Sequence, residues 1–323
     1  MTDSMSLVPV PSISVLMAVY NGLPYVEEAI ASVLAQGFAD FELVVVDDAS
    51  TDATPAALER FRCSDPRVRV FRMPANSGPV LAANRGLEEV RAPLLARLDA
   101  DDVWRVDRLA RQVEAFERQP DLVLLGSAFD YIDAAGRPIG EGNPPLDDRV
   151  LQSTLMEAGN PFCHSSMLMR TDALKALGGY RQVVNRYGLD YDLCLRMAEL
   201  GRIGNLPQRL VGYRIHAGQI TVTKMRPQLR SAQVYRALAR QRRSGRPEDV
   251  SLAQADPAES VAALRRAEAA GSLYWADLME RVGSPEGARQ LRWNALCAAP
   301  LHPGLRKLAW TRLKRALRVG GAA

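Results

Sequence analysis

The sequence predicts an α/β fold: a doubly wound, mostly parallel sheet flanked by helices, with a helical C-terminal extension. Apolar runs without polar alternation, such as Ile13–Val19, are typical of strands that are buried on both faces. These runs alternate with segments in which apolar residues recur at helical spacing, as expected for the crossovers between parallel strands. Beyond Arg226 the strand signal stops, and Ala- and Arg-rich helical segments follow one another.

Repeated strand–helix units make up the first part of the chain. The first strand ends in a turn at Asn21–Pro24, and the apolar spacing that follows predicts a helix over Tyr25–Leu34. Thr54 and Pro55 are the expected cap and first residue of the next helix. The strands expected in this part are Ile13–Val19, Phe41–Val46, Val68–Phe71 and Leu94–Leu98, with a helix over Val80–Val90 before the last of them.

The middle of the chain continues with less regular elements. A helix is expected from about Arg105 to Arg118, and Leu122–Ile132 is a further strand. The segments expected after these are a short strand at Pro161–Met169, a short helix at Asp172–Leu177 that stops at Gly178–Tyr180, and a helix that opens at Leu189. We therefore expect residues 1–11 to form a tail, 12–220 an α/β domain and 221–323 an α-helical region.

Composition and charge exclude several classes of protein. A net charge of +4 on 323 residues is too small for a dedicated nucleic-acid binder. The cysteines form no C-x-x-C pair and the histidines lack zinc-ligand spacing, which favours reduced thiols and a cytosolic location. The first residues lack a basic cluster followed by an apolar core, and no stretch reaches about 18 apolar residues, so neither a secretion signal nor a membrane span is expected.

Three carboxylates stand within four residues directly after the strand Leu94–Leu98. Asp99, Asp101 and Asp102 would repel one another by about 1 kcal/mol or more even near the surface, and a divalent cation with oxygen ligands relieves such crowding. The pattern therefore predicts a Mg²⁺ or Mn²⁺ site. The alternative is a solvated turn in which Asp102 caps the helix that starts near Arg105.

A second acidic loop, Asp47–Asp48, follows the strand that ends at Val46. In a doubly wound sheet, ligands bind beyond the carboxyl ends of the strands. Both acidic loops lie on that edge, so we expect them to face one crevice although they are about fifty residues apart. In the alternative interpretation, Asp48 ties down Thr51 or the next helix.

Several of these segments resemble family 2 glycosyltransferases of the GT-A fold, over roughly Ser12 to His216. The segments that carry the resemblance are Ser14–Gly22, Val44–Asp52, Leu98–Asp102, Tyr187–Gly201 and Val211–His216. The resemblance implies a GT-A catalytic domain with a nucleotide-binding half at about 12–102 and an acceptor half at about 103–220.

The resemblance also implies which residues bind the nucleotide-sugar donor. They are Ala18, Val19, Tyr20, Asp48, Asp99, Ala100 and Asp101. Main-chain groups of 18–20 would complete a base pocket in which Asp48 hydrogen-bonds the base, usually uracil. Asp99 would lie near the ribose, and Asp101 would hold a Mn²⁺ or Mg²⁺ ion that bridges the diphosphate.

Further ligand and acceptor residues follow from the same resemblance. Asp102 and His216 are additional candidate metal ligands, and His164 with Ser165 are candidates for binding the acceptor. For His216 and His164 the alternative is a structural histidine with satisfied hydrogen bonds. Asn84, Arg85 and Arg97 are candidates for steadying phosphates, against the alternative of solvated helix faces.

Asp190 aligns with the family's catalytic base in inverting enzymes, although Leu189 stands where many relatives have Glu. Asp192 is the rival, but helical geometry turns it about 200° away from Asp190, so only one of them can face the cleft. The alternative role of Asp190 is a charge at a helix N-terminus. Arg196 is expected to pair with Asp192 at i, i+4.

The activity implied is inverting transfer of a sugar from a nucleoside diphosphate sugar, with UDP-sugars favoured, to an acceptor hydroxyl. A hexosyltransferase in bacterial cell-surface polysaccharide or glycolipid synthesis fits, with a carbohydrate or lipid-linked acceptor. The alternative is a nucleotide-sugar sensor or scaffold without turnover. A dinucleotide-dependent oxidoreductase is disfavoured because Asn21–Pro24 is not a G-x-G-x-x-G turn.

The C-terminal stretch predicts a basic amphipathic helix. Its apolar face is Leu305, Leu308, Ala309, Leu313, Ala316 and Leu317, surrounded by Lys and Arg without any acid. Such a helix suits an anionic membrane surface, which predicts a cytoplasmic protein that is peripheral at the inner face of the cell membrane. The alternative is a helix that packs on its own domain with a solvated basic side.

Overall fold

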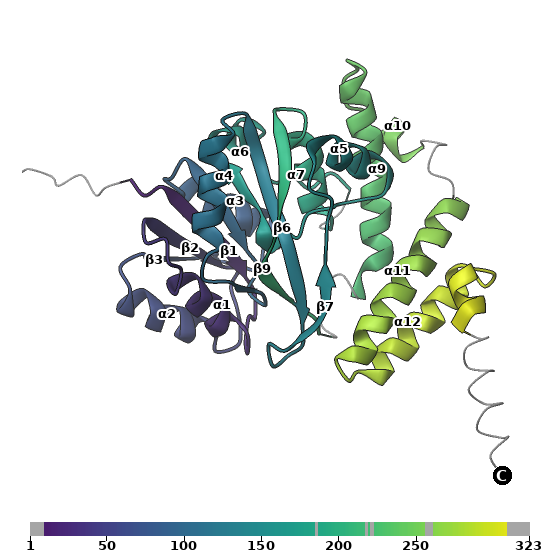
Figure 1. The fold of residues 1–323 in the computed structure, drawn as a ribbon, viewed down its shortest axis with the longest axis horizontal. Helices are drawn as coiled ribbons and strands as arrows, with labels where there is room; N and C mark the ends of the chain where they lie inside the picture. Colours follow the sequence, from purple (N-terminus) through teal and green to yellow (C-terminus); the bar gives the residue numbers. More distant parts are fainter. Residues whose placement is uncertain (1–9, 185–186, 217–218, 220–222, 256–260, 309–323) are drawn as a thin grey trace, which may run out of the picture. The chain divides into compact units, whose positions relative to one another are not determined.

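The computed structural model describes residues 10–184, 187–216, 219, 223–255 and 261–308. Contacts divide the chain into two compact units, which Figure 1 shows as an α/β part and a mainly helical part. The first unit comprises the chain up to Tyr131, Glu141–Gln182 and Leu189–Arg214. The second comprises Ile132–Gly140, Val183–Gly188 and the chain from Ile215 onward.

The first unit contains the sheet and its covering helices. Its strands are β1 (Ile13–Val19), β2 (Phe41–Asp47), β3 (Val68–Arg72), β4 (Leu94–Leu98), β5 (Val103–Trp104), β6 (Leu122–Ile132), β8 (Leu168–Arg170) and β9 (Arg202–Arg214). The strand β7 (Pro138–Gly142), of which only the last two residues belong to this unit, pairs with β6. Its helices are α1 (Val26–Leu34), α2 (Thr54–Ser64), α3 (Pro79–Glu89), α4 (Arg108–Arg118), α5 (Asp148–Glu157), the 3₁₀ turn η1 (His164–Ser166), α6 (Thr171–Ala176) and α7 (Leu189–Met197).

The strand order is β3-β2-β1-β4-β8-β6-β9-β5. The chain builds outward from β1 to β3 and then crosses back to place β4 on the other side of β1, and all of these pairs are parallel. This reversal creates a switch point between β1 and β4, where doubly wound sheets bind ligands. The predicted α/β fold is thereby confirmed, with antiparallel pairs at β4–β8, β6–β8 and β5–β9 in the other half.

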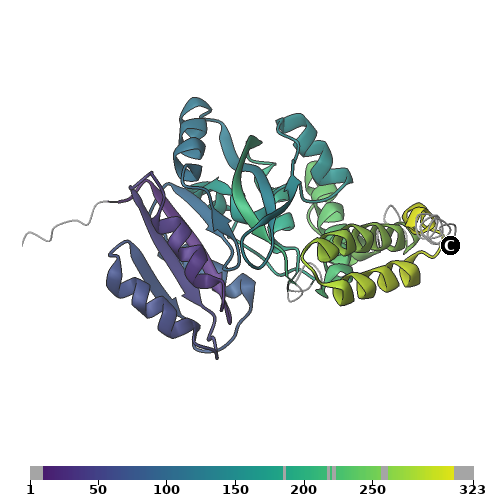
Figure 2. The same ribbon diagram turned by 60° about the horizontal axis from the view of Figure 1, so that its bottom comes forward.

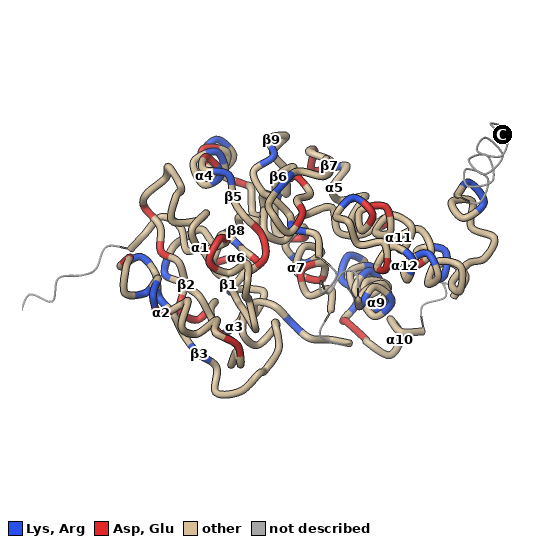
Figure 3. The backbone as a smooth tube through the Cα atoms, turned by 90° about the horizontal axis from the view of Figure 1, so that it is seen from below, with Lys and Arg blue, Asp and Glu red and all other residues tan. Residues whose placement is uncertain are grey.

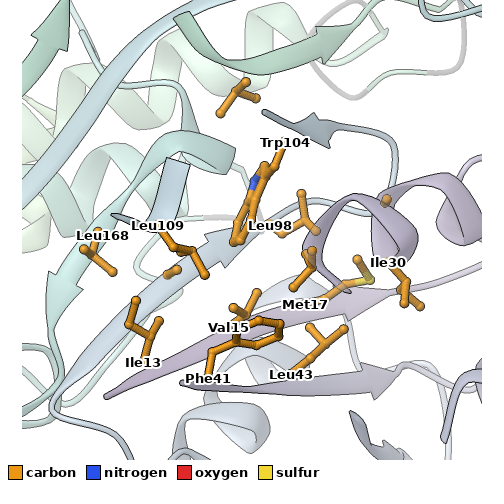
Figure 4. Packing of buried hydrophobic residues seen from close by; sticks show 14 of the residues in the cluster. Ile13, Val15, Met17, Ile30, Phe41, Leu43, Leu98, Trp104, Leu109 and Leu168 are labelled. Carbon is orange, nitrogen blue, oxygen red and sulfur yellow. The ribbon is translucent and has the colours of Figure 1, made fainter. Parts of the chain in front are cut away.

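Burial on both faces explains why the strand runs lack alternation. Every residue of β2 is buried, as are most residues of β1, and α1 packs Val26, Ile30 and Val33 against them. Figure 2 shows α1 lying across these strands, and Figure 4 shows Ile30 beside Met17 and Leu43 in the resulting core.

Two predicted elements needed correction. The helix expected from Arg105 begins at Arg108, because Val103–Trp104 pairs with β9 as a short strand. The strand expected over Pro161–Met169 is instead the η1 turn followed by β8, since the N–H groups of 166 and 167 bond back to the carbonyls of 163 and 164.

The second unit is largely helical, as the sequence predicts for the C-terminal region. Among its described residues, the helices are α9 (Met225–Arg243), α10 (Val250–Gln254), α11 (Val261–Arg281) and α12 (Pro285–Ala298), and residues 303–308 are helical. Ala269, Ala295 and Ala298 form a core between α11 and α12, where small side chains let the helix backbones approach closely. Residues 309–323 of the predicted basic helix lie outside the described residues. In the described part of the chain, no helix combines the length and apolarity needed to span a membrane.

A buried polar cluster braces the edge of the sheet where β1, β2 and β4 begin. Glu42, only 2% exposed, accepts hydrogen bonds from the Ser14 hydroxyl at 2.6 Å, from Arg69 at 2.8 Å and from the backbone and side-chain N–H groups of Arg91 at 2.9 Å. Burial alone would raise the pKa of Glu42, but these donors outweigh it and the pKa is lowered.

Glu42→Gln should therefore lower the free energy of unfolding by about 3 kcal/mol at neutral pH, because it leaves two guanidinium groups without their shared carboxylate. The folded-state pKa lies below the unfolded value, so this stabilisation is present above about pH 4.3 and disappears as the pH falls through the folded pKa. Denaturant unfolding of both proteins at a series of pH values measures the difference. Glu59→Gln, which breaks an exposed pair on α2, is the control and should change nothing measurable. A difference that does not depend on pH would contradict the assignment.

Candidate active site

The two acidic loops lie on one edge of the sheet, on either side of the end of β1. Met17 of β1 lies opposite Leu98 of β4, and Val19 lies opposite Asp47 of β2, so the loops after these strands emerge side by side. The Asp48 N–H donates to the Val19 carbonyl at 2.8 Å, which ties the loops after β1 and β2 together. The parallel register thus places Ala18–Tyr20 and both acidic segments along one edge.

Asp48 is buried, and its carboxylate fastens the start of α3. Its two oxygens accept hydrogen bonds at 2.8 Å from the N–H groups of Ser77 and Gly78, the residues directly before the helix. Thr51 is held by another side chain, since its N–H donates to Asn21 Oδ1 at 2.8 Å. Tyr20, the residue directly before Asn21, is 48% exposed.

Asp99 is held by two cationic or potentially cationic partners. His164 Nδ1 lies 3.0 Å from Asp99 Oδ2, and Arg97 Nη2 lies 3.4 Å from Oδ1. Burial opposes ionisation of the carboxyl group, yet His164 and Arg97 outweigh it and lower the pKa of Asp99 to about 2. Asp99 is therefore a carboxylate at neutral pH. Arg97 is buried and contacts Asp99, so it does not lie on a solvated face.

Asp102 is 1% exposed, which excludes the alternative of a solvated helix cap; the N-cap position of α4 is Asp107. Asp102 Oδ1 accepts the Arg214 N–H at 2.9 Å. The Ser165 hydroxyl lies near the Asp102 carboxylate and favours its ionised form. Among the described residues, however, Asp102 Oδ2 has no hydrogen-bond partner with good geometry. Burial, followed by the charges of Asp101 and Asp99, raises the pKa of Asp102 well above its usual range.

The acidic loop Asp99–Asp102 suits a hard divalent cation that takes its remaining ligands from outside the loop. A cation would offset the repulsion around Asp101 and Asp102 and satisfy the unpaired Asp102 oxygen. Over the described residues, no three Asp, Glu, His or Cys side chains converge into a metal-binding group. One or two carboxylates with the remaining ligands from phosphate oxygens and water is the usual mode for Mg²⁺ bound with a substrate.

Arg214 supports this loop from β9. Its side chain is completely buried; Nε donates to the Asp101 carbonyl at 2.8 Å, Nη2 to Glu28 at 2.6 Å, and the guanidinium lies 4.7 Å from the ring centre of Tyr25. The sequence pattern drew attention to His216 in this segment and missed Arg214. His216 belongs to the second unit, and its role as a metal ligand stays a prediction.

The η1 turn lies beside Asp99 because β8 runs antiparallel to β4. Ser165 is fully buried; its hydroxyl accepts the Asp99 N–H at 3.0 Å and its carbonyl accepts Trp104 Nε1 at 3.0 Å. Ser165 thus lies beneath the acidic loop. His164 uses both ring nitrogens, since its Nε2 lies 3.1 Å from the Tyr180 hydroxyl.

Asn84 of α3 clamps Tyr180. Its side-chain oxygen accepts the Tyr180 N–H at 2.9 Å and its side-chain nitrogen donates to the Tyr180 carbonyl at 2.7 Å. Burial raises the pKa of the Tyr180 hydroxyl, and the nearby charges of Asp99 and Asp190 add to this. The sequence pattern predicts only a helix stop at Tyr180 and a phosphate contact at Asn84.

Asp190 and Asp192 have different environments, as helical geometry predicts. Asp190 is partly exposed and accepts a 2.8 Å hydrogen bond from Asn160 Nδ2. Asp192 is completely buried, bonded by Arg181 at 2.7 and 2.8 Å and by Arg196 at 2.8 Å. The expected pair between Asp192 and Arg196 is confirmed. Asn160 had given no signal in the sequence beyond its place in a polar loop.

Comparisons with known proteins agree with this architecture. The amylovoran biosynthesis glycosyltransferase AmsE of Erwinia amylovora is 30% identical over 217 residues, 66% of this chain and 79% of that protein. The structure of S. aureus TarS 1-349 in complex with UDP-GlcNAc has a TM-score of 0.57 at 18% identity and covers 87% of this chain and 90% of its own.

The mannosyltransferase PcManGT from Pyrobaculum calidifontis, in complex with GDP-Man and Mn²⁺, has a TM-score of 0.55 at 21% identity and covers 96% of this chain and 81% of its own. At these identities the structural likeness concerns the fold alone. The model of the family described as glycosyl transferase family 2 matches residues 14–178, which is more than half of the chain. The chain therefore belongs to glycosyl transferase family 2, with the GT-A fold.

Proposed function

We propose that the protein is a metal-assisted, inverting hexosyltransferase that uses a nucleoside diphosphate sugar, with a UDP-sugar as the favoured donor. The observation that carries the proposal is that Asp48, Asp99 and Asp101 directly follow the two strands that flank β1, on the edge of the sheet where its switch point lies. The UDP-GlcNAc and GDP-Man complexes of the two structural neighbours support a nucleotide sugar as donor. They support no choice between the two bases.

In the proposed donor complex, the base lies at the edge formed by residues 18–20 and Asp48. The exposed Tyr20 ring offers an apolar face to a base, and carboxylate oxygens suit an imide N–H. Asp99, ionised and oriented by His164, would accept hydrogen bonds from ribose hydroxyl groups. Ala100 lies between Asp99 and Asp101, where its main chain would follow the sugar and diphosphate.

Asp101, with Asp102 as a further candidate, would hold the Mn²⁺ or Mg²⁺ ion. When bound, such an ion stabilises the negative charge that gathers on the departing diphosphate. Arg214 fixes the carbonyl of Asp101 and the carboxylate of Asp102, so the loop keeps its shape while its charges are neutralised.

Asp190 is the proposed general base. Its carboxylate is partly exposed at the start of α7 and is oriented by the Asn160 amide. The rival Asp192 is buried and forms ion pairs with Arg181 and Arg196. Asp190 would take the proton of the acceptor hydroxyl while that oxygen attacks the anomeric carbon opposite to the diphosphate, which inverts the configuration.

The acceptor is proposed to be a carbohydrate or lipid-linked carbohydrate in bacterial surface polysaccharide or glycolipid synthesis. The amylovoran biosynthesis enzyme among the relatives supports this class.

We further propose that the protein is cytoplasmic and binds anionic phospholipid at the membrane surface through a patch on α12 and the following residues, formed by Arg289, Trp293, Leu296, Leu301 and Arg306.

Exposure and charge support the patch as a lipid-binding surface. Trp293, Leu296 and Leu301 are 59%, 41% and 74% exposed. All residues of the patch except Leu301 line an open groove of about 880 Å³. Among the described residues, Arg289 and Arg306 have no ion-pair partner. Figure 3 shows basic residues, which are arginines, on α12. Tryptophan beside unpaired arginines is typical of an interface with anionic lipid.

Asp190→Asn should lower kcat by about 10²- to 10⁴-fold while the Kd for the donor stays unchanged, because the amide keeps the shape and loses the base. Sugar transfer and donor binding measured on the same preparation test this. Asp172→Asn, an exposed carboxylate in the first turn of α6, is the matched control. Full turnover in the Asp190 variant would remove that residue from the role of base. Donor binding by the wild type without any product, across a panel of acceptors, would instead favour a sensor or scaffold.

Asp101→Ala should weaken binding of UDP in the presence of Mn²⁺ and abolish the difference between Mn²⁺ and EDTA. The reason is that the carboxylate acts through the ion and not directly on the nucleotide. Isothermal titration with UDP and with GDP, each with and without Mn²⁺, gives the result. A wild-type protein whose nucleotide affinity does not respond to Mn²⁺ or Mg²⁺ would contradict metal assistance.

The double variant Arg289→Ala/Arg306→Ala should bind vesicles that contain phosphatidylglycerol about 30-fold more weakly, since each basic residue contributes about 1 kcal/mol at an anionic surface. Co-sedimentation against pure phosphatidylcholine vesicles provides the reference. Arg265→Ala/Arg266→Ala on α11 removes the same charge outside the patch and should have little effect. Equal loss in both double variants would reject the patch as the contact surface.

A further inference from the structure

We propose that His164 is a positioning residue: Tyr180 and His164 together orient the Asp99 carboxylate for the nucleotide-sugar donor, in place of the acceptor contact that the sequence suggested for His164. This inference rests on the proposed function, because it assigns to Asp99 a role in holding the donor.

The hydrogen-bonding partners determine which ring nitrogen of His164 donates to Asp99. The Asp99 carboxylate can only accept hydrogen bonds, so His164 Nδ1, 3.0 Å away, carries the proton. His164 Nε2 lies 3.1 Å from the Tyr180 hydroxyl, which can donate to a neutral ring or accept from a protonated one. Tyr180 thus holds the ring in the orientation in which Nδ1 donates to Asp99, as partners of ligating side chains do in metal sites.

The tyrosine is itself fixed on both sides of its backbone. Asn84 bonds the N–H and the carbonyl of Tyr180, at 2.9 and 2.7 Å, so the hydroxyl group is carried by a rigid anchor. Asn84 belongs to α3, the helix whose start is fastened by Asp48. A continuous series of contacts therefore runs from the carboxylate proposed for the base to the one proposed for the ribose.

Little room remains for another role of the imidazole. Its two nitrogens are both engaged, its side chain is 15% exposed, and the ring meets the Tyr180 ring edge-on at 5.9 Å. An acceptor contact would need a free ring nitrogen. The same geometry leaves Asp99 with one third of its side chain exposed, which is enough for a ligand to reach the carboxylate.

Two isosteric substitutions separate the functions of the two nitrogens. Asn carries its amide nitrogen close to the place of Nδ1, so His164→Asn can still donate to Asp99. Gln reaches the place of Nε2, so His164→Gln can bond Tyr180 but leaves Asp99 without its donor. Both variants remove the ring and leave an amide, which makes each the control for the other.

The readout is the Kd for UDP with MnCl₂ by isothermal titration, together with the KM and kcat for the donor and the melting temperature. His164→Gln should raise the Kd and the donor KM by about 10- to 100-fold, the usual effect of losing an outer partner, while His164→Asn stays within about threefold of the wild type. Tyr180→Phe should fall between them. The two His164 variants should melt at similar temperatures.

Other outcomes overturn the inference. Equal losses of UDP affinity in both His164 variants, in proportion to their melting temperatures, would indicate a structural role only. Unchanged UDP affinity with a raised KM for an acceptor would restore the acceptor role. Failure of the wild type to bind UDP or GDP at all would instead refute the proposed function, which keeps the two results distinguishable.

Discussion

The crowding of acidic groups after β4 is the constraint around which the first unit is organised. Asp99, Asp101 and Asp102 follow the buried end of β4; Asp102 is itself buried and the other two are only partly exposed, so water screens their charges incompletely. Each is held differently: Asp99 by His164 and Arg97, the Asp101 main chain by Arg214, and Asp102 by the backbone of β9. The strands β8 and β9 thus serve the acidic loop as much as they extend the sheet.

The parallel half of the fold could be predicted from the sequence because its signals are local. Apolar runs such as Ile13–Val19 end in turn residues, helical periodicity follows, and the carboxyl ends of parallel strands must share an edge. The placement of Asp48 and of the loop after β4 on the same edge of the sheet follows from that topology alone. Helical geometry likewise separates Asp190 from Asp192. Each residue of an α-helix is rotated by about 100° from the one before, so when Asp190 faces outward Asp192 faces the core.

The remaining contacts could not be predicted because they depend on antiparallel pairing between distant segments. His164 meets Asp99 only because β8 inserts beside β4 in one particular register, and Arg214 reaches the acidic loop only because β9 pairs with the two-residue strand β5. A segment as short as Val103–Trp104 carries no periodicity that distinguishes it from the first turn of a helix. Tertiary pairing therefore decided both the boundary of α4 and the partners of the loop.

The double hydrogen bonding of Asp48 has a consequence for how this enzyme could acquire a different donor. The side chain proposed to read the base also supplies the acceptors for the backbone just before α3, so exchanging it would loosen a helix as well as alter recognition. Evolution or protein engineering toward another nucleotide would meet less resistance at Tyr20, which is exposed. Drift in donor preference is therefore expected to enter through the periphery of the pocket, while its central carboxylate stays fixed by the architecture it sustains.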